Sequence, residues 1–253
     1  MKVTILGSGT SQGVPVIGCQ CDVCKSEDAR DKRLRSSILV EQGNTTLVVD
    51  TGPDFRQQML RHNVSKLDAV LITHCHKDHI AGLDDIRSYN YLQRKPMDVY
   101  ARKEDQQAIK HEFYYAFTDN SYPGVPRINL MNLNAKPLQI GDVEVIPFEV
   151  MHMNLSVMGF RFGDLSYITD VNYISASSME IIRGSKVIIL GALRKKKHLS
   201  HFTLDEAIEI IRELNPDQAY FTHVSHLMGT YKEVQAILPS QMSLAHDGLQ
   251  IIV

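Results

Sequence analysis

The chain has 253 residues, of which 43% are hydrophobic and 22% are charged, as is ordinary for a soluble globular protein. Its formal net charge of −2 argues against a non-specific nucleic-acid binder, because it implies no broad basic face. No stretch approaches the roughly 18 apolar residues of a membrane span, and the apolar N-terminal run is too short for a secretory signal. We therefore expect a cytoplasmic protein with a single domain over residues 1–253.

The first part of the chain alternates short apolar strands with helices. A strand over residues 2–6 runs into a glycine-rich loop, and a Gly43-Asn44 turn predicts a hairpin between residues 37–40 and 46–50. Asp54 is placed to cap a helix through residue 61, and residues 69–72 form a buried-type strand. Helices are expected over residues 84–92 and 104–115, and a loop over residues 118–127.

The second part of the chain repeats this rhythm. A helix is expected over residues 203–214, with Thr203 and Glu206 forming a capping box. Strands are expected over residues 143–150, 156–162, 166–169, 187–190, 218–222 and 250–253. Grouped strands with helices between the groups predict an α/β (α+β) fold, a sandwich of two sheets with helices on both outer faces.

The segment from Thr73 to His79 carries the strongest signal for chemistry. Directly after a buried strand, it places four ligand-type residues within six positions: His74, His76, Asp78 and His79. Imidazole and carboxylate are the ligands expected for zinc, manganese or iron. His74 and His76 can chelate one ion from the same side of an extended backbone, and the other two residues can serve a second ion. Two ions about 3.5–4 Å apart can share a bridging water and generate hydroxide near neutral pH. The alternative, a set of solvated loop side chains, is rare at this density.

Three of the four cysteines form a second cluster, Cys19, Cys21 and Cys24. In an intracellular chain such residues are not expected to form disulfides, and metal ligation is the better interpretation. A structural zinc site is closed by four protein ligands. From the residues alone the fourth ligand could be Cys75, His198, His226 or a more distant residue.

The spacing His-x-His-x-Asp-His resembles the defining motif of the metallo-β-lactamase superfamily. The resemblance implies a four-layer αβ/βα sandwich with two divalent ions, zinc or manganese, at one edge of the sheets. It also implies further ligands downstream, and His152, Asp170 and His223 match them in order and in context. The implied ligand sets are His74, His76 and His152 for one metal, Asp78, His79 and His223 for the other, with Asp170 between them.

Three features together resemble the PhnP-type phosphodiesterases: the cysteine array, the glycine-rich start, and the pair His223 and His226. The resemblance extends over essentially the whole chain. The resemblance implies a structural zinc on an N-terminal cysteine loop, held by Cys19, Cys21, Cys24 and His226. It also implies hydrolysis of small, perhaps cyclic, phosphodiesters, in which Asp78 and His201 are the expected catalytic residues. Asp247 would support a metal ligand without binding the metal itself. The expectation that the protein forms a homodimer rests on this resemblance only.

Several interpretations stay open. The basic run from Arg194 to Lys197 is either a solvated face or a site for a second anion of the substrate, and His198 is a weaker candidate than His201 for contact with phosphate. The same core also serves tRNA 3′-processing nucleases, β-lactamases, thioester hydrolases and a non-catalytic PqqB-like carrier. No long basic or glycine-rich arm for gripping RNA is visible, and the full ligand set argues against a carrier.

Overall fold

Two seven-stranded sheets form the centre of the computed structural model, which describes residues 1–118 and 122–253. The first sheet has the order β14-β1-β2-β3-β4-β5-β6 and the second β13-β12-β11-β10-β9-β8-β7. The strands of the first sheet are β1 Lys2–Gly7, β2 Ser37–Gln42, β3 Thr45–Val49, β4 Ala69–Leu71, β5 Met97–Ala101, β6 Ile128–Asn132 and β14 Gln250–Ile252. Those of the second are β7 Leu138–Ile140, β8 Val143–His152, β9 Leu155–Phe162, β10 Leu165–Ile168, β11 Val187–Gly191, β12 Gln218–Thr222 and β13 Met242–Leu244.

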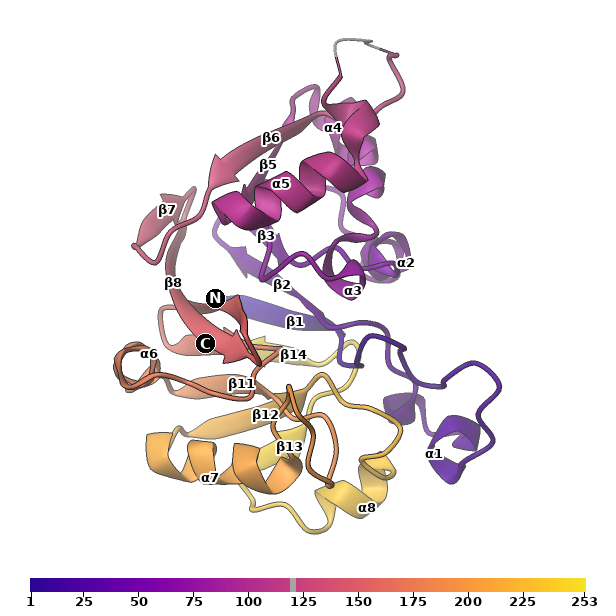
Figure 1. The fold of residues 1–253 in the computed structure, drawn as a ribbon, viewed down its shortest axis with the longest axis vertical. Helices are drawn as coiled ribbons and strands as arrows, with labels where there is room; N and C mark the ends of the chain where they lie inside the picture. The colour runs from indigo at the N-terminus through magenta and orange to yellow at the C-terminus, as the bar shows by residue number, and fades with distance from the viewer. Residues whose placement is uncertain (119–121) are drawn as a thin grey trace.

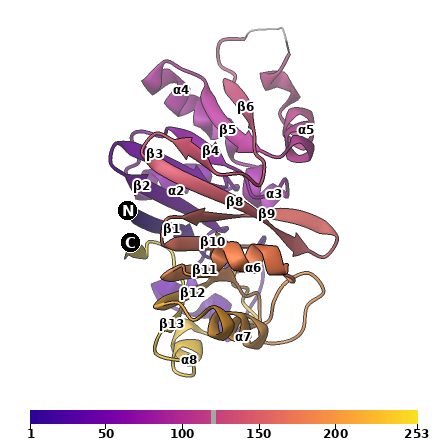
Figure 2. The ribbon, with the colours of Figure 1, turned by 90° about the vertical axis from the view of Figure 1, so that its left-hand side faces the viewer.

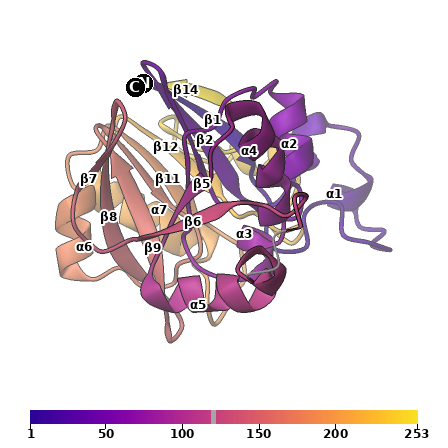
Figure 3. The ribbon, with the colours of Figure 1, turned by 90° about the horizontal axis from the view of Figure 1, so that it is seen from above.

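Helices cover the outer faces of both sheets (Figures 1 and 2). On the side of the first sheet lie α2 Phe55–Arg61, α3 Lys77–Ile80, α4 Arg87–Gln93 and α5 Lys103–Glu112, with the 3₁₀ turns Leu83–Ile86 and Tyr114–Ala116. On the side of the second lie α6 Ala176–Ile182, α7 Leu204–Leu214 and α8 Tyr231–Gln235. The short α1 Asp22–Lys25 belongs to a segment that projects from one side of the molecule, followed by the 3₁₀ turn Ala29–Asp31 (Figure 3).

Alternating side chains along the strands divide the core into three apolar layers. In β2, Ile38 and Val40 pack between the sheets, whereas Leu39 packs under the helices of the first sheet. In the second sheet, Ile189 of β11 belongs to the central layer and its neighbour Leu190 to the layer under α6 and α7. Because successive residues of a strand point to opposite faces, both sheets are apolar on both sides. The predicted four-layer sandwich is confirmed.

Most expected elements agree with the structure, and the hairpin at Gly43-Asn44 joins β2 to β3. Thr203 and Glu206 form both hydrogen bonds of the predicted capping box. Asp54 stands at the N-cap of α2, but its carboxylate accepts from Arg35 instead of capping the helix. Of the expected loop 118–127, residues 119–121 lie outside the described residues. Among the described helices, none has the length and apolar character needed to cross a bilayer.

Candidate metal centre

The carboxyl ends of strands from both sheets meet at one edge of the sandwich. β10, β11 and β12 run parallel, and β8 runs in the same direction as β10 through two antiparallel pairings with β9. Their chain ends therefore lie together, as is usual for sites in α/β proteins. β4 of the first sheet ends at the same place. We call the ligand-type residues that gather there the strand-end cluster: His74, His76, Asp78, His79, His152, Asp170 and His223.

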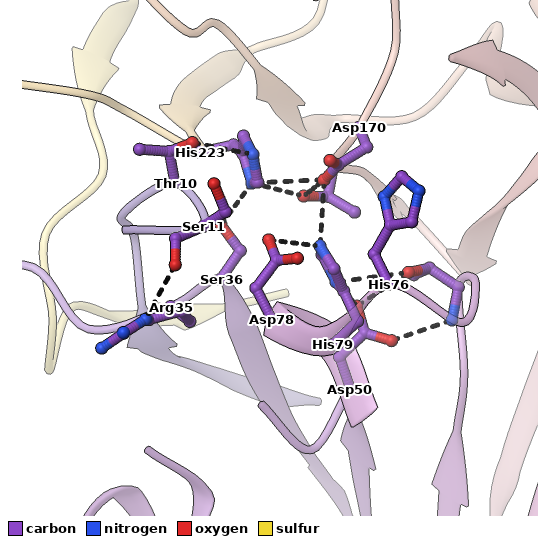
Figure 4. Close-up of polar contacts among 12 residues, drawn as sticks. Thr10, Ser11, Arg35, Ser36, Asp50, His76, Asp78, His79, Asp170 and His223 are labelled. Carbon is purple, nitrogen blue, oxygen red and sulfur yellow. Dashed lines mark hydrogen bonds and ion pairs between the residues drawn. The ribbon is translucent and has the colours of Figure 1, made fainter. Parts of the chain in front are cut away.

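Asp170 is the centre of this cluster, with 2% of its surface exposed. Its Oδ1 lies 3.3 Å from Nε2 of His79 and 3.2 Å from Nδ1 of His223, and Oδ2 of Asp78 lies 3.2 Å from the same Nε2 of His79 (Figure 4). The ligand atoms of all four residues lie within 4.8 Å of one another. This set joins Asp78, His79 and His223 to Asp170, as the sequence predicts.

The second predicted ligand set is arranged differently in one respect. The ring nitrogens of His74 and His76 approach to 2.8 Å, and these two residues form a compact group with Asp170. The ring of His152 lies beside them, with centroids 6.0 Å from His74 and 5.4 Å from His76. Its ligand atoms, however, form a compact group with Asp170 and His201. Asp170 thus takes part in all three groups, which is the arrangement expected of a carboxylate shared by two ions.

A buried polar atom tests whether these residues fit a cation. Nε2 of His79 is buried, and within the described parts of the chain it makes no hydrogen bond, although two carboxylates lie near it. Buried polar atoms are normally satisfied, so an orphaned ring nitrogen among carboxylates indicates a missing partner. Imidazole with carboxylate is a donor set suited to zinc or manganese. The cluster therefore fits a divalent metal ion.

Polar residues outside the strand-end cluster orient its histidines. Nδ1 of His79 lies 2.7 Å from the fully buried Asp50, which also accepts hydrogen bonds from the backbone and hydroxyl of Thr73. Both ring nitrogens of His223 have hydroxyl partners, Thr10 and Ser36, each at 3.2 Å (Figure 4). Such contacts orient the rings of metal-binding histidines. Asp50 is not among the residues predicted from the sequence, although its position directly after the apolar strand β3 is a signal.

The electrostatics of the cluster separate one histidine from the rest. Burial alone would lower the pKa of His79, but Asp50, Asp170 and Asp78 raise it well above its ordinary value. Burial lowers the pKa values of His74 and His223. Neutral imidazole is the form that binds metals, so most of the cluster is ready to accept a cation.

His201 is the imidazole that the sequence placed beside the metals. Burial, followed by the nearby His223, lowers the pKa of His201 to about 3. The ring stacks on His223 with centroids 4.9 Å apart and lies 4.5 Å from that of His152. His201 therefore contacts the cluster directly as a neutral group. His198 lies one step further out, with its ring centroid 5.3 Å from that of His201.

The predicted structural site is also brought together. Nδ1 of His226 lies 3.3 Å from Sγ of Cys19 and 3.4 Å from Sγ of Cys21, and Cys24 completes a group within 4.8 Å. Hydrogen bonds, first from the backbone of Cys24 and then from His226, lower the pKa of Cys21 to about 6. Three thiols and one imidazole have the composition of a closed zinc site. We call these four residues the cysteine cluster; Cys75 lies elsewhere, partly buried against the outer core layer.

The carboxylate of Asp247, near the C-terminus, accepts hydrogen bonds from the N-terminal part of the chain next to the candidate metal centre. Its Oδ1 accepts from the backbone and hydroxyl of Ser8, and its Oδ2 accepts from the backbone of Leu34. The carbonyl of Ser8 in turn accepts from Val224, the residue after His223. Asp247 therefore holds the backbone segment that pairs with the residue after His223, and its support of a metal ligand stays a prediction.

Comparisons with known proteins agree with this geometry. Residues 45–224 match the family model described as a beta-lactamase superfamily domain. A solved structure of a diphosphatase from the PhnP family is 39% identical with a TM-score of 0.93, covering 99% of this chain and 96% of that chain. Zinc-bound PqqB from Methylobacterium extorquens shares the fold over 100% of both chains, with 20% identity and a TM-score of 0.80.

One relative is much longer than this chain. A protein of Porphyromonas gingivalis (strain ATCC BAA-308 / W83) named octanoyltransferase is 37% identical over 256 residues, covering 100% of this chain and 52% of that protein. The chain thus spans about half the length of this curated relative, and its name describes a protein with additional sequence.

Proposed function

Because the chain belongs to the β-lactamase superfamily, as a PhnP-type hydrolase of the metallo-β-lactamase fold, we propose that it hydrolyses small phosphodiesters. The observation that supports this most is the position of Asp170 in three compact groups of ligand atoms at once. A carboxylate shared in this way suits two divalent ions, zinc or manganese, that act on one phosphate group. The reaction adds water across one P–O bond and yields a phosphomonoester and an alcohol.

The proposed division of labour follows the geometry. Bound divalent ions would neutralise phosphate oxygens and make a water more acidic. The strand-end cluster would hold the ions, and Asp78, at its more exposed side, would also accept a hydrogen bond from the attacking water. His201 is neutral, since its pKa is about 3, and would donate a hydrogen bond to the phosphate or to the leaving oxygen. The cysteine cluster would hold a structural zinc.

Turnover of bis(4-nitrophenyl) phosphate with added manganese or zinc tests this function. We expect release of 4-nitrophenolate that depends on the metal and is lost on chelation. A protein with a full complement of metal but no turnover with any divalent ion would contradict the proposal and favour a carrier role. Cleavage of a precursor tRNA in preference to small diesters would favour a nuclease.

A second candidate function comes from the octanoyltransferase of Porphyromonas gingivalis, half of which matches this chain. A substrate with an octanoyl ester or thioester would place a carbonyl, instead of a phosphate, at the strand-end cluster. Parallel assays with 4-nitrophenyl octanoate and bis(4-nitrophenyl) phosphate separate the two. Faster turnover of the octanoate would replace the phosphodiesterase proposal.

A further inference from the structure

A cavity of about 220 Å³ opens beside the strand-end cluster, on the side of the cysteine cluster. It shares His201 with the metal centre, and Thr10, which also lines it, lies 3.2 Å from Nε2 of His223. Since a water in the liquid occupies about 30 Å³, the cavity has room for a polyatomic group. A substrate bound at the cluster would therefore extend into this cavity, which we call the anion cavity for the reasons below.

The lining of the cavity favours negative charge. Arg194, His198 and the hydroxyl residues Thr10 and Ser11 all line it, and no carboxylate is found among its described lining residues. Nδ1 of His198 lies 3.3 Å from the backbone N–H of Ser200, which makes that nitrogen an acceptor. A neutral imidazole that accepts at Nδ1 carries its proton on Nε2 and donates there. Burial, and after it the Arg194 cation, lowers the pKa of His198 and so favours this neutral donor.

Arg194 is held in place by its own loop. Its Nε donates to the carbonyl of Lys196 at 3.1 Å, and its Nη2 donates to that of Lys197 at 2.8 Å. Within the described parts of the chain, no hydrogen bond or ion pair uses Nη1, so its two N–H groups remain for a ligand. An arginine whose fork is fixed in advance loses less side-chain entropy on binding phosphate.

The three lysines of the basic run do not line the anion cavity. Lys197 forms an ion pair with Glu206 on α7, and Lys195 reaches the turn at Gly229. Lys196 is exposed and does not line the cavity. Of the four basic residues that the sequence could not distinguish, only Arg194 belongs to the cavity.

We propose that the anion cavity binds a second phosphate group of the substrate and that Arg194 is its specificity-determining residue. This rests on the proposed function, because the first phosphate is the one held by the strand-end cluster. The preferred substrates are then phosphodiesters that carry a further phosphate next to the one that is cleaved. The remaining N–H groups of Nη1 would recognise such a group through charge-assisted hydrogen bonds.

The test compares two inhibitors of bis(4-nitrophenyl) phosphate turnover, inorganic phosphate and methylenediphosphonate. For each enzyme the readout is the ratio of the two inhibition constants, which corrects for any general loss of activity. In the wild type the diphosphonate should bind at least about tenfold more tightly, the worth of one charge-assisted interaction. Arg194→Gln should remove most of this preference and Arg194→Lys should restore part of it. The matched control Lys196→Gln should leave the ratio and the turnover unchanged.

An unchanged ratio in Arg194→Gln would overturn the proposal, and so would an equal loss of preference in Lys196→Gln. If the wild type shows no turnover, calorimetric titration of the metal-loaded protein with methylenediphosphonate decides the same question. Weaker binding to Arg194→Gln than to Lys196→Gln would then support the anion cavity even though the phosphodiesterase proposal had failed. Equal binding to both variants would contradict it.

Discussion

The strand-end cluster and the cysteine cluster rest on different kinds of backbone. The first takes its residues from the ends of four strands in two sheets, and Asp170 and His79 within it are almost fully buried. The second takes three of its four residues from one projecting loop, whose only helix is the four-residue α1. Around that loop, Cys19 and Cys21 are half-buried and Ile17 is fully exposed.

This difference predicts opposite roles for the metal. At the strand ends, the apolar layers of the sandwich position the ligands whether or not a cation is bound, so loss of the cation should affect the reaction more than the fold. In the cysteine loop few apolar contacts are available, so a bound zinc should organise the loop and contribute to stability. Substitutions in the two clusters should therefore separate activity from melting temperature.

The largest effect on activity is expected for Asp170→Ala. Removing the carboxylate shared by all three ligand groups should lower kcat for bis(4-nitrophenyl) phosphate about a thousandfold, since metal ions supply several kcal/mol of charge stabilisation. Metal content should fall with it, while Tm changes little. The matched control is Asp164→Ala, at the opposite end of β10, where the carboxylate pairs with Lys186 on the surface. Full activity in Asp170→Ala would contradict the proposed dinuclear metal centre.

The largest effect on stability is expected for Cys21→Ser. Loss of one ligand of the cysteine cluster should destabilise the protein by about 3 kcal/mol and lower Tm by about 6–12 °C for a chain of this size. The zinc content should drop by one ion per chain, as elemental analysis measures. Gln20→Ala, an exposed neighbour in the same loop, should change neither quantity. An unaltered Tm together with unaltered zinc would speak against the structural site.

A smaller effect on activity is expected for Asp50→Asn, which keeps the shape of the side chain but removes the charge behind His79. Such supporting contacts are worth about 10- to 100-fold in metal affinity or activity. Titration of the metal-free protein with zinc or manganese should show weaker binding, and added metal should restore part of the turnover. Wild-type metal affinity in this variant would show that Asp50 does not position the ring.

The smallest effect, on stability alone, serves as a control for the other variants. Thr230 caps α8 through a capping box with Glu233, away from the strand-end cluster. Thr230→Ala should cost about 1 kcal/mol and lower Tm by about 2–4 °C. Metal content and turnover should stay at the wild-type level. A loss of metal in this variant would mean that general destabilisation, and not the removal of a ligand, explains the result for Cys21→Ser.

Part of the fold was predictable because buried strands leave a clear apolar pattern. The missed strands β6 and β7 are the outermost strands of their sheets, and β7 has three residues, so neither shows a run of buried side chains. The missed β13 is likewise an outermost strand with three residues, and β5, an interior strand, alternates buried and half-buried side chains instead of forming a buried run. Edge position, short length and, in β5, alternating burial account for the strands that the apolar pattern did not predict.

The candidate site was predictable where ligands follow strands in a known spacing. Asp50 was missed because a single carboxylate after a strand resembles many others until its contact with His79 is seen. The grouping of His152 with His201 depends on side-chain placement between two distant loops, which no spacing encodes. Likewise, only the structure shows that Arg194 lines the anion cavity while Lys197 pairs with Glu206.

Anomalous X-ray scattering at the zinc and manganese absorption edges tests most directly that distant strand ends hold a pair of cations. We predict two peaks within the strand-end cluster, on either side of Asp170, and a third, zinc peak within the cysteine cluster. Crystals of active protein with a peak at the cysteines but none beside Asp170 would contradict it.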